Sequence, residues 1–126
     1  MDGVDVAITE FKQHEITAII SKTEPYPSTL RGQVEELSRK NRRYSLKKIA
    51  DLDIRIGSHF ADALLSLLTE NHISPQAITG IGNHGQTLLH NPTGAFPFTW
   101  QIGNSPTIAV KTGIPTAYDF RSVDVA

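Results

Sequence analysis

The chain has 126 residues, with 12 Lys and Arg against 13 Asp and Glu and no cysteine. This length supports a single domain, and the net charge of −1 provides no overall attraction to nucleic acid or to an anionic membrane. The lack of cysteine excludes a disulfide framework, a thiolate metal site and a cysteine nucleophile, and it favours a cytoplasmic protein.

The longest segment without charged residues, residues 71–110, does not have the composition of a membrane-spanning helix. Gly, Pro, His, Asn and Gln interrupt it throughout. Because it carries no Asp, Glu, Lys or Arg, we expect it to be mostly buried. We expect no membrane partner for this chain.

The N-terminal part predicts a hairpin followed by a helix. Residues 4–11 and 16–23 are rich in β-branched residues and lie on either side of a short polar turn. Ser28 is the expected N-cap of a helix over residues 29–39.

The longest predicted helix covers residues 46–71, with Ser45 as its N-cap. Its apolar residues recur at helical spacing. Asp53 lies at the edge of this apolar stripe, and we expect it to bond a neighbouring loop while Gly57 permits close packing of the helix. Residues 39–48, with six basic residues in ten, could bind nucleic acid or phosphate, although a solvated loop is the commoner explanation.

The remainder predicts short elements of both kinds. A helical turn is expected at residues 74–77, and a helix at residues 106–111, capped by Asn104 or Ser105 and ended by Gly113. Strands are expected at residues 78–82, 87–90, 98–103 and 114–120. The order of elements predicts an α/β domain with a mixed sheet and flanking helices.

Three groups of polar residues are candidates for chemistry. Asp2-Gly3-Val4-Asp5 could offer backbone N–H groups to a phosphate and a carboxylate to Mg²⁺, or could be a flexible acidic terminus. The second group lies in a loop after a predicted strand, where ligands of α/β folds bind. Its side chains either suit sugar hydroxyls or bond the local backbone of a polar turn: His84, Gln86 and Thr87.

The third group is Asp119 and Arg121, which could grip an anionic or hydroxyl-rich ligand or could form a weak surface ion pair. His72, His84 and His90 do not have the spacing of a zinc site.

Taken together, the chain resembles the N-terminal part of the anhydro-N-acetylmuramic acid kinase family. Two of the clearest motifs are Asn-His-Gly-Gln-Thr and Asp-Phe-Arg-Ser-Val-Asp. The matching segments occur in family order: residues 1–7, 52–57, 60–63, 81–87, 101–103, 112–114 and 119–126.

The resemblance implies a two-lobed cytoplasmic enzyme with an actin-like, ribonuclease-H-like fold. Such enzymes use ATP and Mg²⁺ to hydrolyse the anhydro ring of 1,6-anhydro-N-acetylmuramic acid and to phosphorylate the sugar, yielding N-acetylmuramic acid 6-phosphate in cell-wall recycling. A homodimer is compatible with the full-length enzyme, and no nucleic-acid partner is expected.

Family residues carry over only in part. The phosphate-binding stretch matches Met1, Asp2, Gly3, Val4 and Asp5, with Asp2 as the candidate Mg²⁺ ligand. Substrate contacts are expected from five residues: His84, Gln86, Thr87, Asp119 and Arg121.

Several family features have no match here. The strand before the phosphate hairpin and its Ser-Gly-Thr-Ser turn are not matched, and the catalytic aspartate lies beyond Ala126, so no catalytic residue is assigned. Asn83 stands where a small residue is more common, and Trp100 stands where leucine is usual, which we interpret as a change in strand packing.

We therefore expect residues 1–126 to be a single partial domain of a kinase, inactive alone and with its first strand missing. Two alternatives of other classes remain: a non-catalytic sugar-binding or interaction module, and a nucleic-acid-binding protein that uses residues 39–48.

Overall fold

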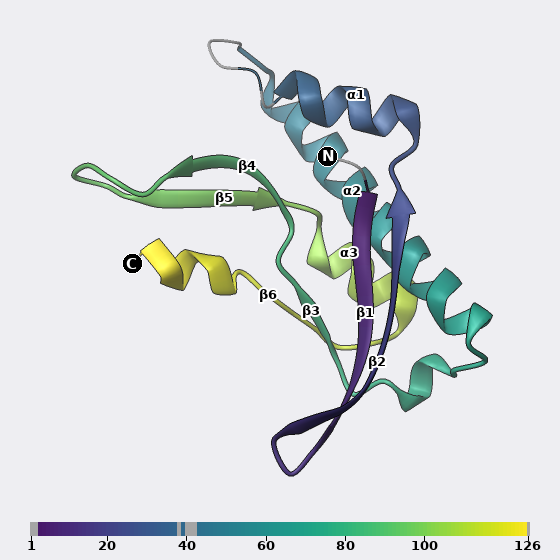
Figure 1. Cartoon of the computed structure of the whole chain (residues 1–126). Coiled ribbons are helices and arrows are strands. Elements are labelled where there is room, and N and C mark those ends of the chain that lie inside the picture. The colour runs from purple at the N-terminus through teal and green to yellow at the C-terminus, as the bar shows by residue number, and fades with distance from the viewer. Residues whose placement is uncertain (1–2, 38, 40–42, 126) are drawn as a thin grey trace.

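The computed structural model describes residues 3–37, 39 and 43–125 of the chain (Figure 1). The elements, in chain order, are β1 (Gly3–Lys12), β2 (Glu15–Pro25), α1 (Ser28–Leu37), α2 (Leu46–Glu70), the 3₁₀ turn η1 (Pro75–Ala77), β3 (Ile81–Asn83), β4 (Gln86–Asn91), β5 (Phe98–Ile102), α3 (Ser105–Thr112), β6 (Thr116–Tyr118) and the 3₁₀ turn η2 (Phe120–Val125). The predicted α/β class is confirmed.

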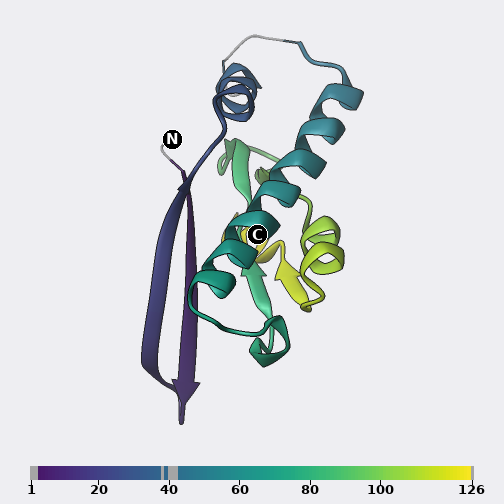
Figure 2. The ribbon, with the colours of Figure 1, turned by 90° about the vertical axis from the view of Figure 1, so that its right-hand side faces the viewer.

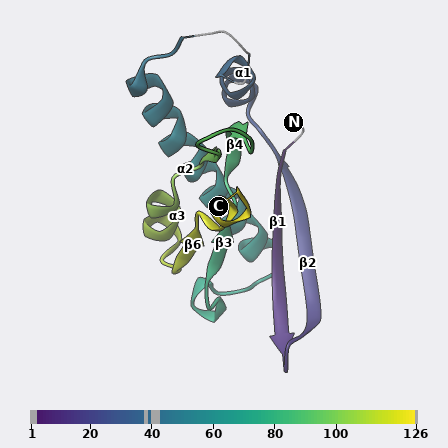
Figure 3. The ribbon, with the colours of Figure 1, turned by 90° about the vertical axis from the view of Figure 1, so that its left-hand side faces the viewer.

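The strands form three separate two-stranded sheets. β1 pairs with β2 and β4 with β5, both antiparallel, whereas β3 pairs with β6 in parallel. Figures 2 and 3 show the β1–β2 hairpin standing beside the rest of the molecule rather than joined to β3. The expected single mixed sheet is therefore not formed within the described residues.

A cavity of about 1080 Å³ separates β1 from β3. Every residue from 3 to 11 and every residue from 77 to 86 borders it, and Phe60 and Leu64 of α2 line it from the helical side. Successive side chains of a strand point to opposite faces, so a cavity that touches each residue in turn lies along a strand's edge. The unpaired edges of β1 and β3 therefore both border this cavity.

Helix α2 organises the core. The side chain of Ser45 accepts a hydrogen bond from the backbone N–H of Lys48 at 3.2 Å, which confirms the predicted N-cap. Two clusters use its apolar face. One joins α2 to α1 and β5: Tyr26, Leu30, Val34, Leu37, Leu52, Ile56 and Ile102. The other joins it to the segment between α3 and β6: Leu64, Leu68 and Ile114.

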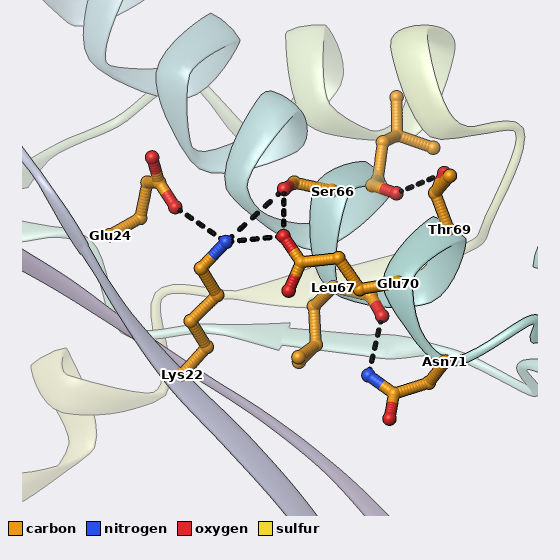
Figure 4. A network of polar contacts seen from close by, with 8 residues as sticks. Lys22, Glu24, Ser66, Leu67, Thr69, Glu70 and Asn71 are labelled. Atoms are coloured by element: carbon orange, nitrogen blue, oxygen red, sulfur yellow. Dashed lines mark hydrogen bonds and ion pairs between the residues drawn. The ribbon is translucent and has the colours of Figure 1, made fainter.

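A polar network attaches the hairpin to the end of α2 (Figure 4). The ammonium of Lys22 on β2 lies 2.5 Å from the carboxylate of Glu70, 3.1 Å from that of Glu24 and 3.4 Å from the hydroxyl of Ser66. Hydrogen bonds to Glu70 and Glu24 raise the pKa of Lys22. Because β1 and β2 share no backbone pairing with the other sheets, such side-chain contacts and apolar packing connect the hairpin to the body.

The junction between α2 and α3 follows the prediction for Asp53 and Gly57. The Asp53 carboxylate accepts hydrogen bonds from the Gly103 N–H at 2.7 Å and from the Asn104 side-chain amide at 3.0 Å. A Cβ at Gly57 would lie 2.5 Å from the Asn104 carbonyl oxygen. Of the two predicted caps, Asn104 caps α3 and Ser105 is its first residue, and Gly113 ends the helix with φ of 71°, as the sequence predicts.

Several predicted boundaries are wrong. Ser28 is the first residue of α1 rather than its N-cap, because the Arg31 N–H bonds to the carbonyl of Pro27. The strand expected at residues 78–82 is shorter and begins at Ile81, and it is only partly buried. The last predicted strand ends at Tyr118, since Asp119 turns the chain into η2.

The expectation that residues 71–110 are mostly buried is also wrong. Most of them are exposed or half-buried, and Phe96 is 87% exposed. None of the helices formed by the described residues has both the length and the apolar character needed to cross a membrane.

Candidate functional site

A pocket of about 270 Å³ lies where β3, β5 and β6 end. Residues from three separate segments line it: Asn83, His84, Gly85, Thr99, Trp100, Gln101, Ile102, Gly103, Ser105, Tyr118, Asp119 and Arg121. Its lining combines hydrogen-bond donors and hydrogen-bond acceptors with aromatic rings. Such a lining suits a small ligand with several hydroxyl groups.

The loop between β3 and β4 has a defined conformation. Gly85 adopts φ of +67°, and a Cβ there would lie 2.8 Å from the Cβ of Gln101 on β5. Both the left-handed backbone and this close approach require glycine. The ring Nδ1 of His84 lies 2.8 Å from the carbonyl oxygen of Gly85, which orients the His84 side chain at the pocket.

Asp119 and Arg121 reach the same pocket through a sharp turn after β6. Asp119 has φ of 62°, a left-handed conformation that aspartate tolerates better than most residues. Its carboxylate accepts a hydrogen bond from the Ser122 hydroxyl at 2.5 Å. This turn brings Arg121 back towards the sheet, where its guanidinium lies 3.5 Å from the hydroxyl of Thr87 on β4.

The other two candidate sugar contacts lie beside the pocket rather than in its wall. The Thr87 hydroxyl accepts from the side-chain amide of Gln101 at 3.3 Å. Gln86 borders the larger cavity between β1 and β3, and its amide donates to the Thr87 carbonyl at 3.3 Å.

The candidate phosphate-binding residues are only partly visible. Met1 and Asp2 lie outside the described residues. Gly3, Val4 and Asp5 begin β1 and border the larger cavity, as do His84 and Gln86. The two predicted groups, far apart in the sequence, therefore line the same cavity. The carboxylate of Asp5 also accepts a hydrogen bond from the Thr23 hydroxyl at 2.5 Å.

Several residues of the pocket wall were not predicted from the sequence. Gln101 and Gly103 lie in a segment that carried the family resemblance but received no role. Trp100, interpreted from the sequence as a packing change, is 40% exposed and lines the pocket. Tyr118 lies at the end of β6 and lines the pocket together with Asp119.

The ionisable groups with shifted pKa values lie outside the pocket. Burial raises the pKa of Tyr26 to about 12 and lowers the pKa of His59, whose ring lies 5.3 Å from that of Tyr26. The described residues include no group of three or more His, Cys, Asp or Glu that could hold a metal ion. The pocket therefore offers mainly hydrogen-bonding groups, together with the guanidinium of Arg121 and the carboxylate of Asp119.

Comparison with known proteins gives a consistent result. The family model described as anhydro-N-acetylmuramic acid kinase matches residues 1–126. The anhydro-N-acetylmuramic acid kinase of Vibrio vulnificus (strain YJ016) is 44% identical over the whole chain. The enzymes of that name from Sulfurovum sp. (strain NBC37-1) and Pasteurella multocida (strain Pm70) are 40% and 38% identical over the same length. The chain spans about a third of the length of these relatives, at 34%, 34% and 33%.

Proposed function

Because this chain belongs to the anhydro-N-acetylmuramic acid kinase family, we propose that it forms part of an ATP-dependent kinase of 1,6-anhydro-N-acetylmuramic acid. The complete reaction adds water across the anhydro bond and transfers the γ-phosphoryl group of ATP to the released 6-oxygen. The products are N-acetylmuramic acid 6-phosphate and ADP. In this proposal residues 1–126 are one partial domain of a two-lobed cytoplasmic protein.

The pocket at the ends of β3, β5 and β6 supports the sugar as ligand. Its carboxamide, imidazole and hydroxyl groups can both donate to and accept from hydroxyls, and Arg121 can pair with the carboxylate of a muramic acid. We assign sugar contacts to the pocket residues His84, Asp119 and Arg121, with Gln86 and Thr87 beside them.

The start of β1 is the proposed location for ATP phosphates. Gly3, Val4 and Asp5 border the larger cavity that His84 and Gln86 also line, so phosphate and sugar bound at these places would be neighbours. Bound Mg²⁺ would neutralise charge that develops on the transferring phosphoryl group. The described residues offer it no cluster of ligands, and the candidate Asp2 lies outside them.

The finer fold proposal is a ribonuclease-H-like sheet in which one more strand lies between β1 and β3. The two edges that border the cavity support it, because a strand placed there would find backbone groups on both sides.

Phosphate transfer tests the proposed function directly. Residues 1–126 alone should form no sugar phosphate from ATP, because the family's catalytic aspartate is expected outside this segment. A hybrid enzyme, in which residues 1–126 replace the matching segment of the Vibrio vulnificus (strain YJ016) relative, should form it. Chromatography of the product with labelled ATP measures both. Sugar phosphate from pure residues 1–126, or an inactive but folded hybrid, would contradict the proposal.

In the hybrid enzyme, Gln86→Ala should weaken sugar binding more than ATP binding. The side chain borders the cavity next to His84 and can reach a hydroxyl, and one lost hydrogen bond of this kind changes affinity by about five- to tenfold. Calorimetry with each ligand measures the two affinities. Gln76→Ala, in the exposed turn η1, is the matched control. Unchanged sugar affinity in Gln86→Ala would assign that side chain a purely structural role.

A further inference from the structure

Asn83 is a buried polar residue, 9% exposed, at the end of β3. Its side-chain Nδ2 donates to the Gly103 carbonyl at 2.7 Å and to the Ser105 hydroxyl at 2.8 Å. Its Oδ1 accepts from the backbone N–H of Gly85 at 3.0 Å. One side chain therefore joins the loop after β3 to the turn before α3.

These partners require a carboxamide. The Gly103 carbonyl can only accept, so it needs a donor, and the Gly85 N–H can only donate, so it needs an acceptor. A carboxylate of the same size would place oxygen against the Gly103 oxygen. A small side chain would leave the Gly85 N–H without its partner.

The backbone N–H of Gly103 is bound by a side chain of α2. The Asp53 carboxylate accepts from the Gly103 N–H at 2.7 Å, so both peptide groups of Gly103 are held, one by α2 and one by Asn83. A continuous chain of hydrogen bonds thus leads from α2 through Gly103 and Asn83 to Gly85.

The last residue in this series of hydrogen bonds, Gly85, also contacts the ring of His84 and bears on which ring nitrogen carries the proton. The Gly85 carbonyl oxygen lies 2.8 Å from Nδ1 of His84. A carbonyl accepts only, so in the neutral ring Nδ1 carries the proton and Nε2 is left as an acceptor. The exposed His84 side chain lines the pocket, where an Nε2 acceptor suits the O–H of a sugar.

We propose that Asn83 is a positioning residue: it holds Gly85 so that His84 presents an unprotonated Nε2 to a hydroxyl of the bound sugar. This inference rests on the proposed function for the identity of the ligand, but the tautomer of His84 can be measured without any ligand.

The experiment uses the hybrid enzyme with Asn83→Asp and, as matched control, Asn91→Asp at the exposed end of β4. Asn83→Asp should raise KM for the sugar about tenfold, the effect of one lost buried hydrogen bond, and should leave KM for ATP within about twofold. Asn91→Asp should change neither. Asn83→Ala, which also removes the acceptor of the Gly85 N–H, is the second variant and keeps the test open if the carboxylate prevents folding.

The second readout is the ¹⁵N spectrum of histidine-labelled hybrid, in which loss of a signal in His84→Gln assigns His84. The parent protein and Asn91→Asp should show the Nδ1-protonated ring, and the Asn83 variants should shift towards the Nε2-protonated form. An unchanged tautomer in both Asn83 variants would overturn the inference. An active hybrid whose Asn83 variants keep the parent KM for sugar would overturn it as well. A folded hybrid without kinase activity would contradict the proposed function, and the tautomer would still decide the role of Asn83.

Discussion

Residues 1–126 produced alone are expected to be insoluble or to unfold without a cooperative transition. The reason lies in the cavity of about 1080 Å³ along β1 and β3, whose facing edges lack backbone partners. No residue of β1 is buried and only Asn83 is buried in β3, so these edges are left open to water and to pairing with the edges of other chains. Exposed Phe11, Ile16 and Ile19 near the hairpin tip add a surface prone to aggregation.

Adding before residue 1 the strand and Ser-Gly-Thr-Ser turn that the family resemblance implies should restore a cooperative transition. The gain in solubility should exceed that of any point substitution. Thermal unfolding followed by circular dichroism, together with the dispersion of amide NMR signals, measures the change. A Gly/Ser extension of equal length is the control. A sharp transition and dispersed signals from residues 1–126 alone would show that the two edges do not destabilise the chain.

The same substitution at two helical glycines should change stability in opposite directions. Gly57→Ala in α2 places a Cβ 2.5 Å from the Asn104 carbonyl oxygen, so the helix and the α3 turn must separate. A loss of about 1–3 kcal/mol is expected. Gly32→Ala in α1 meets no atom within 4 Å, and its higher helix propensity should add about 0.5–1 kcal/mol.

Both variants are measured in the chain extended by the upstream strand, by urea unfolding, with the midpoint and the slope compared. A Gly57→Ala variant as stable as Gly32→Ala would mean that the α2–α3 junction accommodates a methyl group. The packing role predicted for Gly57 would then be wrong.

Helix ends could be predicted from the sequence where they depend on residues close together in the chain. The Ser45 cap of α2, the Asn104 cap of α3 and the left-handed Gly113 each depend on a few neighbouring residues. The bond between Asp53 and the Gly103 turn was predicted in kind, because a carboxylate on the edge of an apolar stripe needs a partner. Its partner, fifty positions away, could not be identified from the sequence.

What the sequence could not predict depends on long-range geometry. The separation of β1 from β3 is a property of the assembled fold, and so is the exposure of residues 71–110, whose lack of charge had suggested burial. The roles of Asn83 and Asp119 arise from bonds and backbone angles that no spacing encodes. Recognition of the motifs indicated the loops for which ligand contacts are proposed, but not which side chain holds another in place.

The position of Trp100 has an optical consequence. It is the single tryptophan of the chain, 40% exposed, and it lines the pocket in which the sugar is proposed to bind. Indole emission depends on the polarity of its surroundings, so its wavelength and intensity report on this one location. In the extended chain, which needs no label, a change in emission on adding sugar would follow occupancy of the pocket without ATP or turnover.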